Sequence, residues 1–207
     1  MTPTPLLYLL IHPDIGASRA NKLFASSVSQ LPGVNFVDLY AQYPDFFIDG
    51  AAERRRIDNT DTIVVQMPVY WYAGPSLFKE WIDRTFIPGW AHGEAGTALT
   101  GKSLLLSVTT GSPQSEWVRT STHRATAEDY LRPYQQMAQF CGMNWLEPTV
   151  FYEARSSNPI PLEVHAKLLR QRITGLVDDI TTRHRKLEFA EKSLTLPAAD
   201  EREFHGE

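Results

Sequence analysis

Residues 63–86 read IVVQMPVYWYAGPSLFKEWIDRTF and contain three patterns in succession. Ile63 to Met67 is almost continuously apolar, as expected of a strand that is covered on both faces. A loop with three consecutive aromatic residues follows between Pro68 and Pro75. The last part has apolar residues on one side of a helix that stops at Pro88-Gly89, namely Leu77, Phe78, Trp81, Ile82 and Phe86. Strand, loop and helix in this order predict one unit of an α/β fold.

Four further strands are indicated elsewhere in the chain. Leu6 to Ile11 and Leu104 to Val108 are apolar runs like the one above, and we expect central strands there. Val34 to Leu39 is mixed with polar residues, and Asn144 to Tyr152 contains Pro148, which has no N–H for a ladder. The last two segments therefore fit edge strands.

Helical patterns separate these strands. The first helix should start near Ser18, a second should surround Glu53 to Ile57, and the last should run from about Pro161. Another should begin at Thr126, where Asp129 completes a capping-box variant. We expect Pro133 to kink or delay that helix.

Five alternations of strand and helix predict a doubly wound parallel sheet with helices on both faces, most simply in the order 2-1-3-4-5. Residues 1–182 would form one domain, and the charged residues 183–207 a solvated and partly disordered tail. Ligands of such a sheet bind outside the carboxyl ends of the strands. Three loops are therefore candidates for function, at residues 12–21, 68–76 and 109–123.

Composition narrows the class of protein. The 207 residues carry a net charge of −4, which gives no basic footprint for nucleic acid. No apolar run approaches the roughly 20 residues of a membrane span, so we expect no direct membrane insertion. Cys141 is the single cysteine, which suits a reducing compartment and a structural role in the core. No histidine pair has the i, i+4 spacing of a helical zinc site, and we expect no metal.

Each candidate loop has a functional and an ordinary interpretation. Ser18 and the free N–H groups of a helix N-terminus form an anion site, or Ser18 is an N-cap alone and Arg19 a surface charge. The aromatic loop at residues 68–75 suits a flat polar ring such as an isoalloxazine, or is a core-packing loop. Thr109-Thr110-Gly111 could wrap the pyrimidine edge of the same ring, or form an ordinary turn.

A fourth motif points to a different class of protein. Gly96 to Ser103 matches the phosphate-binding loop pattern G-x-x-x-x-G-K-[ST] at every position. Such a loop needs a strand before the glycines and a helix after the lysine, so that N–H groups converge on phosphate. Here Lys102 leads directly into an apolar strand pattern. We therefore interpret the match as a decoy.

With its loops in this order, the chain resembles the flavodoxin-like NAD(P)H:quinone oxidoreductases. It resembles most closely the ancillary quinone reductases of glutathione-regulated potassium-efflux systems. The resemblance covers most of residues 5–152. Its most specific stretches are residues 39–46, 68–72, 79–83, 89–93, 96–102 and 109–111.

The resemblance implies a set of site residues. Three groups of residues would contact the flavin at its phosphate end, at the edge and face of its ring, and at its pyrimidine side. In that order they are His12, Ser18, Arg19, Ala20 and Asn21; Pro68, Val69, Tyr70 and Trp71; and Thr109, Thr110, Gly111 and Ser112.

The relatives also use a tyrosine and a histidine after the fourth strand to help charge rearrange during hydride transfer. Those residues fall near Trp117 and His123, so His123 is the candidate catalytic residue. Trp117 has no hydroxyl and cannot replace the tyrosine, and Ser112-Pro113 departs from the usual Gly-Gly.

The implied activity is a two-electron, ping-pong transfer from NADH or NADPH through FMN or FAD to a quinone. Relatives are homodimers with the flavin near the interface, which would give Trp90 or Trp117 a partner surface. The alternative is a regulatory subunit docked on the cytoplasmic side of a potassium/proton antiporter. A one-electron flavodoxin is disfavoured because the first loop contains His12-Pro13-Asp14 rather than a hydroxyl-rich segment. Either leading function implies a cytoplasmic protein, peripheral to the membrane only through a partner.

Overall fold

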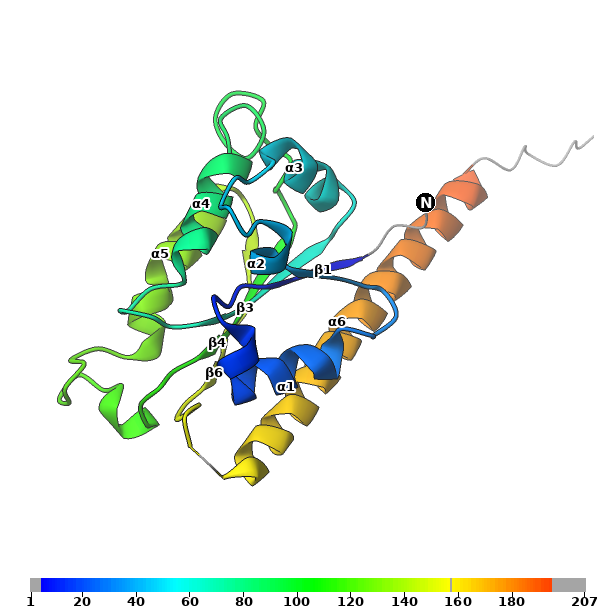
Figure 1. Cartoon of the computed structure of the whole chain (residues 1–207). Helices are drawn as coiled ribbons and strands as arrows, with labels where there is room; N and C mark the ends of the chain where they lie inside the picture. The colour runs from blue at the N-terminus through cyan, green and yellow to red at the C-terminus, as the bar shows by residue number, and fades with distance from the viewer. Residues whose placement is uncertain (1–4, 157, 195–207) are drawn as a thin grey trace, which may run out of the picture.

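The computed structural model describes the backbone of residues 5–156 and 158–194, and side chains up to residue 190. One parallel sheet runs through the middle of this part of the chain (Figure 1). Its strands are β1 (Leu6–Leu10), β2 (Val34–Asp38), β3 (Thr62–Pro68), β4 (Ser103–Thr109), β5 (Asn144–Trp145) and β6 (Thr149–Phe151).

The strand order is β2-β1-β3-β4-β5, with β6 also paired to β4. The predicted order 2-1-3-4-5 is therefore confirmed, with one refinement at the last strand. β5 pairs with the start of β4, at Ser103 and Asn144, and β6 pairs with its end, at Thr109 and Phe151. Pro148 lies between the two pieces and has no N–H to donate, which accounts for the interruption.

Helices cover both faces of the sheet. They are α1 (Arg19–Val28), α2 (Leu39–Gln42), α3 (Gly50–Asp58), α4 (Ser76–Thr85), α5 (Ala127–Phe140) and α6 (Pro159–Leu194), with short 3₁₀ turns η1 (Ile15–Ala17) and η2 (Gln114–Glu116). α1 and α6 lie on one face, and α3, α4 and α5 on the other (Figure 1).

Each face has its own apolar core, because neighbouring residues of a strand point to opposite sides of the sheet. From β1, Leu7 and Leu9 pack with Phe78 and Trp81 of α4. The alternate residues Leu6 and Tyr8 pack against α1 and α6 on the other side, with residues such as Phe24, Leu169 and Ile173.

The structure corrects two expectations about where helices begin and end. Pro133 does not delay its helix: α5 begins directly after Thr126 and contains Pro133 in its interior. The capping box between Thr126 and Asp129 is fully formed, so the first turn is closed ahead of the proline. The chain also does not leave helical structure at residue 183.

α6 continues to Leu194, and its last turns project beyond the rest of the described chain (Figure 1). The boundary expected at residue 182 thus falls inside a helix. Strong helix formers such as Arg, Lys, Leu and Glu dominate residues 183–194, and the sequence gives no stop signal there. Residues 195–207 of the expected tail lie outside the described residues.

Candidate functional site

The order of the sheet strands creates a crevice where the chain changes direction. β1 and β3 are neighbours, their connections run to opposite sides, and the loops after β1, β3 and β4 meet at one end of the sheet. A cleft of about 440 Å³ lies there. It is lined by His12, Asp14, Ala17, Ser18, Arg19, Asn21, Pro68, Val69, Tyr70, Thr109, Thr110, Gly111, Ala154 and Arg155.

The first wall of the cleft is the start of α1. Ser18 is the N-cap residue, and its Oγ accepts a hydrogen bond from the backbone N–H of Asn21 at 3.2 Å. The first-turn N–H groups of α1 point out of the helix at this end. This is the geometry of an anion site.

His12 places a second donor on the same wall. Its side chain is buried, and burial lowers its pKa below the usual 6.5, although Asp14 and Asp38 nearby act in the opposite direction. The ring Nδ1 accepts a hydrogen bond from the backbone N–H of Asp14 at 3.1 Å. In the neutral imidazole the proton is therefore on Nε2, which is free to donate to a ligand.

A buried polar network under the cleft fixes these positions. The Tyr8 hydroxyl donates to Gln66 Oε1 at 2.8 Å, and Gln66 Nε2 donates to Asn21 Oδ1 at 3.0 Å. Asn21 Nδ2 then donates to Thr109 Oγ1 at 3.0 Å. One chain of hydrogen bonds thus joins β1, β3, α1 and β4 directly below the site.

The second wall is a tight turn that exposes a tryptophan. Tyr70 and Ala73 exchange both backbone hydrogen bonds, and the two residues between them have positive φ, 49° at Trp71 and 66° at Tyr72. Such a turn normally takes Asn-Gly, because a side chain in the left-handed region costs about 1 kcal/mol per residue. Trp71 is 94% exposed. The fold thus holds an apolar ring in solvent at the mouth of the cleft.

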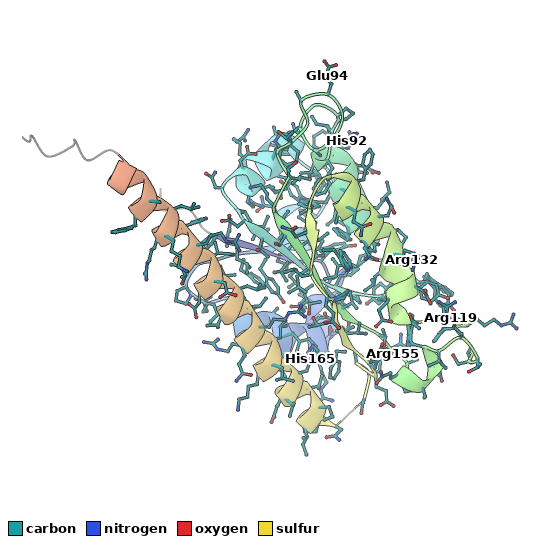
Figure 2. The ribbon with its side chains drawn as sticks, turned by 180° about the vertical axis from the view of Figure 1, so that it is seen from behind. His92, Glu94, Arg119, Arg132, Arg155 and His165 are labelled. Atoms are coloured by element: carbon teal, nitrogen blue, oxygen red, sulfur yellow. The ribbon has the colours of Figure 1, made fainter. Side chains whose placement is uncertain are left out.

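The third wall is the loop after β4, which is held from behind by the chain that follows β6. Thr110 accepts at its carbonyl from the Ala154 N–H at 2.9 Å, and Glu153 donates its N–H to the Ser112 carbonyl at 3.0 Å. This connection brings Arg155 over Gly111, close enough that a Cβ on that glycine would lie 3.4 Å from the guanidinium Nε. Figure 2 shows Arg155 between β6 and α6, on the side of the molecule where Arg119 also lies.

His123 lies beside this wall in a cluster of aromatic rings rather than in the cleft lining. Its Nε2 is 3.0 Å from Ser112 Oγ, and its Nδ1 is 3.4 Å from the Tyr72 hydroxyl. Trp117 packs on it with ring centroids 4.4 Å apart, and Tyr130 stacks on Tyr72 at 4.8 Å. The candidate catalytic histidine is therefore joined both to the loop after β4 and to the turn after β3.

The fold brings the predicted cofactor residues together. All of them line the cleft except Ala20, Trp71 and Ser112. Ala20 turns its side chain into the core and offers only its backbone, while Trp71 and Ser112 adjoin lining residues. Whether they bind a cofactor stays a prediction.

Sequence reasoning missed Asp14, Ala17, Ala154 and Arg155. Asp14 and Ala17 fall inside the segment that was singled out, between His12 and Ser18. Ala154 and Arg155 follow an edge strand, and no local pattern marks them. Only the pairing of β6 with the end of β4 shows that they reach the cleft.

The remaining motifs have structural roles. Ser103 begins β4, and Lys102 Nζ donates to the carbonyls of Thr60 and Asp58 at 2.5 and 3.3 Å, so the phosphate-loop match is a decoy. Cys141 is buried at the end of α5, and burial raises the pKa of its thiol. Trp117 is buried within its own chain, so the expected partner surface at Trp117 is wrong.

Two kinds of feature are absent from the described residues. Within them, no group of three or more His, Cys, Asp or Glu side chains is arranged to hold a metal ion. No helix in the same part of the chain is both long and apolar enough to cross a membrane.

Comparison with known proteins gives consistent folds and differing activities. A family model described as a flavodoxin-like fold matches residues 4–173. The glutathione-regulated potassium-efflux system ancillary protein KefG of Yersinia enterocolitica is 41% identical over 169 residues, which are 82% of this chain and 92% of that protein.

Two solved structures are similarly close. General stress protein 14 of Treponema denticola, in complex with FMN, is 30% identical with a TM-score of 0.76, over 85% of this chain and 99% of that one. A chain from the crystal structure of a thermophilic tryptophan halogenase from Streptomycin violaceusniger is 36% identical with a TM-score of 0.78, over 81% and 97%.

Proposed function

This chain belongs to the flavodoxin-like fold family that its residues 4–173 match, and on that premise we propose a flavin-dependent NAD(P)H:quinone oxidoreductase. The observation that carries the proposal is the cleft itself. A helix N-terminus, a buried neutral histidine, an exposed aromatic turn and a threonine-rich loop line one cavity at the switch point of the sheet. The resemblance to the ancillary quinone reductases is the reason for proposing a quinone as the electron acceptor.

The cleft residues fit an FMN. The N-terminus of α1 and Arg19 suit a phosphate, and the volume of about 440 Å³ is in the range of small-molecule sites. Thr109, Thr110 and Gly111 offer hydroxyls and an unobstructed backbone for the pyrimidine edge. FMN is preferred to FAD because the Treponema denticola protein, which is 30% identical, was crystallised with FMN.

A bound flavin supplies the two-electron hydride chemistry. The chain's own contribution is positioning and electrostatics. His12 Nε2–H and the first-turn N–H groups of α1 bind negative charge, and the buried network through Gln66 and Asn21 keeps those donors in place without reorganisation. The turn at residues 70–73 presents a flat apolar surface to a nicotinamide or a quinone, which would use the same open mouth in turn, as ping-pong kinetics require.

The proposal is tested by the visible absorbance of the purified full chain. We expect a bound flavin whose absorbance bleaches with NADPH or NADH under anaerobic conditions and returns on addition of a quinone. Asn21→Ala should weaken flavin binding by about tenfold or more, because it breaks the network that positions Ser18 and Thr109. Asn59→Ala, on the exposed end of α3, is the matched control. A wild-type chain that takes up no flavin on reconstitution would refute the reductase.

A second function is favoured by the 41% identity to KefG, which is an ancillary protein of a potassium-efflux system. In that case the chain docks on the cytoplasmic part of a potassium/proton antiporter and uses the flavin site as a redox sensor. It would then be a cytoplasmic protein held at the inner face of the membrane by its partner. Co-purification with an antiporter would favour this function over the enzyme if the isolated protein also shows little quinone turnover.

A homodimer accompanies either function in this proposal. Two exposed aromatic side chains support it: Trp71, beside the cleft residue Tyr70, is 94% exposed, and Phe47, in the loop before α3, is 81% exposed. Sedimentation of the purified chain would measure the oligomeric state. A monomer at micromolar concentration would argue against a dimeric site.

A further inference from the structure

Trp117, Ser112, His123 and Tyr72 form one hydrogen-bonded group centred on His123. The resemblance described above implies a tyrosine near position 117, and Trp117 has no hydroxyl. The indole Nε1 of Trp117 donates to Ser112 Oγ at 2.9 Å, and the same oxygen lies 3.0 Å from His123 Nε2. On the other side of the imidazole ring, Nδ1 lies 3.4 Å from the Tyr72 hydroxyl. Residues from two loops are thus connected through one histidine.

The chemistry of the donors determines which atom donates in each hydrogen bond of this group. An indole N–H only donates, so Ser112 Oγ is the acceptor in its contact with Trp117. If His123 Nε2 also carried a proton, Ser112 Oγ would accept twice, and its own hydroxyl proton would make no hydrogen bond within this group. The arrangement that uses every donor has Ser112 O–H donating to His123 Nε2. The proton of the neutral imidazole is then on Nδ1, which donates to Tyr72.

We propose that Trp117 and Ser112 hold neutral His123 in its Nδ1-protonated tautomer, so that Tyr72 supplies the outward hydroxyl donor that position 117 lacks. Tyr72 accepts from His123 and keeps its own O–H for a ligand at the mouth of the cleft. The relay orients donors and transfers no proton. The role of the Tyr72 hydroxyl in turnover rests on the proposed reductase activity, whereas the tautomer of His123 does not depend on it.

The surroundings of the relay support this assignment. Tyr72 is 43% exposed and belongs to the same turn as Tyr70, which lines the cleft. Its ring stacks on Tyr130, and the Tyr130 hydroxyl donates to the His123 carbonyl at 2.8 Å, so both ends of the contact are fixed by one side chain. The positive φ of Tyr72 is the strain that this placement requires.

Glu116 is the competing partner of the imidazole. Its Oε2 lies 3.6 Å from His123 Nε2, and its side chain is 45% exposed. A carboxylate would favour a proton on Nε2, but Ser112 Oγ is closer to that nitrogen, so we expect the hydroxyl to determine the tautomer. A glycine at position 112 would remove the only hydroxyl that links the indole to the imidazole.

The first experiment measures the tautomer. Long-range proton–nitrogen NMR on the full chain, at a pH of about 8, reports which ring nitrogen of His123 is protonated. His123→Gln assigns the signal. We expect Nδ1 protonation in the wild type, a shift toward Nε2 in Ser112→Ala, and restoration in Ser112→Thr, which keeps the hydroxyl. Ser26→Ala, an exposed serine bonded to its own helix, is the control. Nε2 protonation in the wild type, or an unchanged tautomer in Ser112→Ala, would overturn the proposal.

The second experiment measures turnover. Tyr72→Phe keeps the ring stacked on Tyr130 and should lower kcat for quinone reduction about tenfold with KM little changed, a loss of about 1.4 kcal/mol. In Ser112→Ala, kcat should fall by a similar factor, and in Ser112→Thr it should return toward the wild-type value. Wild-type turnover in Tyr72→Phe would overturn the role of its hydroxyl. A wild type that binds no flavin refutes the reductase instead, and the tautomer measurement still decides the relay.

Discussion

His165 is a histidine that the fold holds as a neutral aromatic ring. It lies on α6 between Phe24 and Phe151, with ring centroids 4.6 and 4.9 Å away, and Figure 2 shows it on the side of α6 that faces the sheet. Its Nε2 is buried and has no hydrogen-bond partner in the described part of the chain. Burial lowers its pKa from 6.5 to about 4. The protonated form is therefore excluded from the folded state at neutral pH.

This arrangement predicts a dependence of stability on pH. Between pH 6.5 and about 4 the unfolded chain binds a proton at His165 that the folded chain does not, so the free energy of unfolding falls as pH is lowered through this window. His165→Phe should remove roughly 1–2 kcal/mol of that acid sensitivity, because it keeps the ring packing and has nothing to protonate. Urea denaturation at several pH values measures it. His92→Phe, on the loop at the opposite end of the sheet, should behave as wild type; equal pH slopes in all three proteins would contradict the prediction.

Lys102 allows a direct test of the decoy motif. Its ammonium group donates to two backbone carbonyls at the end of α3 and the loop beyond, and burial lowers its pKa below the usual value. Lys102→Met should lower the free energy of unfolding by about 1–3 kcal/mol through the lost charged hydrogen bonds. Flavin affinity should stay unchanged, since the residue is not part of the cleft lining. Thermal melts and a flavin titration check both; a loss of ATP binding, which a phosphate loop would show, would restore the rejected interpretation.

Glu53 ties α3 to the helix beside it and to the loop after α2. Its carboxylate is fully buried and accepts hydrogen bonds from the Tyr43 hydroxyl, Trp81 Nε1 and Arg56 Nη1, all at 2.8 or 2.9 Å. The Tyr43 contact also raises that phenol's pKa, with burial as the larger cause. The three donors come from different elements, so one carboxylate sets how α3 and α4 pack over the sheet.

Removing this carboxylate should be costly. Glu53→Ala leaves the Tyr43 hydroxyl and the Trp81 N–H buried without an acceptor, and Arg56 without its partner. We expect a loss of about 3–5 kcal/mol of stability. Glu80→Ala, on the exposed side of α4, breaks an i, i+4 pair with Arg84 and should cost no more than about 0.5 kcal/mol. Chemical denaturation of the two variants in parallel gives the comparison, and similar midpoints would show that Glu53 is not a linking residue.

Some features of the whole molecule follow from local sequence patterns, and others appear only in the tertiary structure. Continuous apolar runs such as Ile63–Met67 identify buried parallel strands, and the alternation with helices leaves few sheet orders, so the fold could be predicted. The capping box at Thr126 is likewise local. The helix that begins after Thr126 was expected, but the delay expected from Pro133 is absent because the capping box closes the first turn. The continuation of α6 past residue 183 was missed because the charge of that segment was interpreted as the sign of a solvated tail.

The site shows the same division. Residues within the loops after β1, β3 and β4 were found because parallel strands end on one edge. Arg155 was missed because it reaches the cleft only through the pairing of β6 with Thr109. The relay around His123 was also missed. In the sequence, Trp117 is only a departure from the tyrosine that the resemblance implies. The contacts of His123 with Ser112 and Tyr72, on which our proposal rests, come from the tertiary structure.

The long last helix allows a prediction about which part of the chain the domain needs. Ile173 packs in the core between the sheet and α1, and Ile180 is also buried, whereas Leu187 is 56% exposed on the projecting turns. On those turns His184 Nε2 lies 3.0 Å from Asp61 Oδ2, and both side chains are about one-third exposed.

Two truncations should therefore differ sharply. A chain that ends at residue 182 keeps both isoleucines and loses the partly exposed His184–Asp61 contact, so its free energy of unfolding should fall by about 1 kcal/mol or less. A chain that ends at residue 172 loses both buried side chains, each contributing about 1.5–3 kcal/mol, and should fall by at least about 3 kcal/mol or fail to fold. Thermal and urea unfolding of the two chains beside the full protein measures the difference. Equal destabilisation by the shorter and longer truncation would mean that the projecting turns, rather than the turns packed on α1, stabilise the domain.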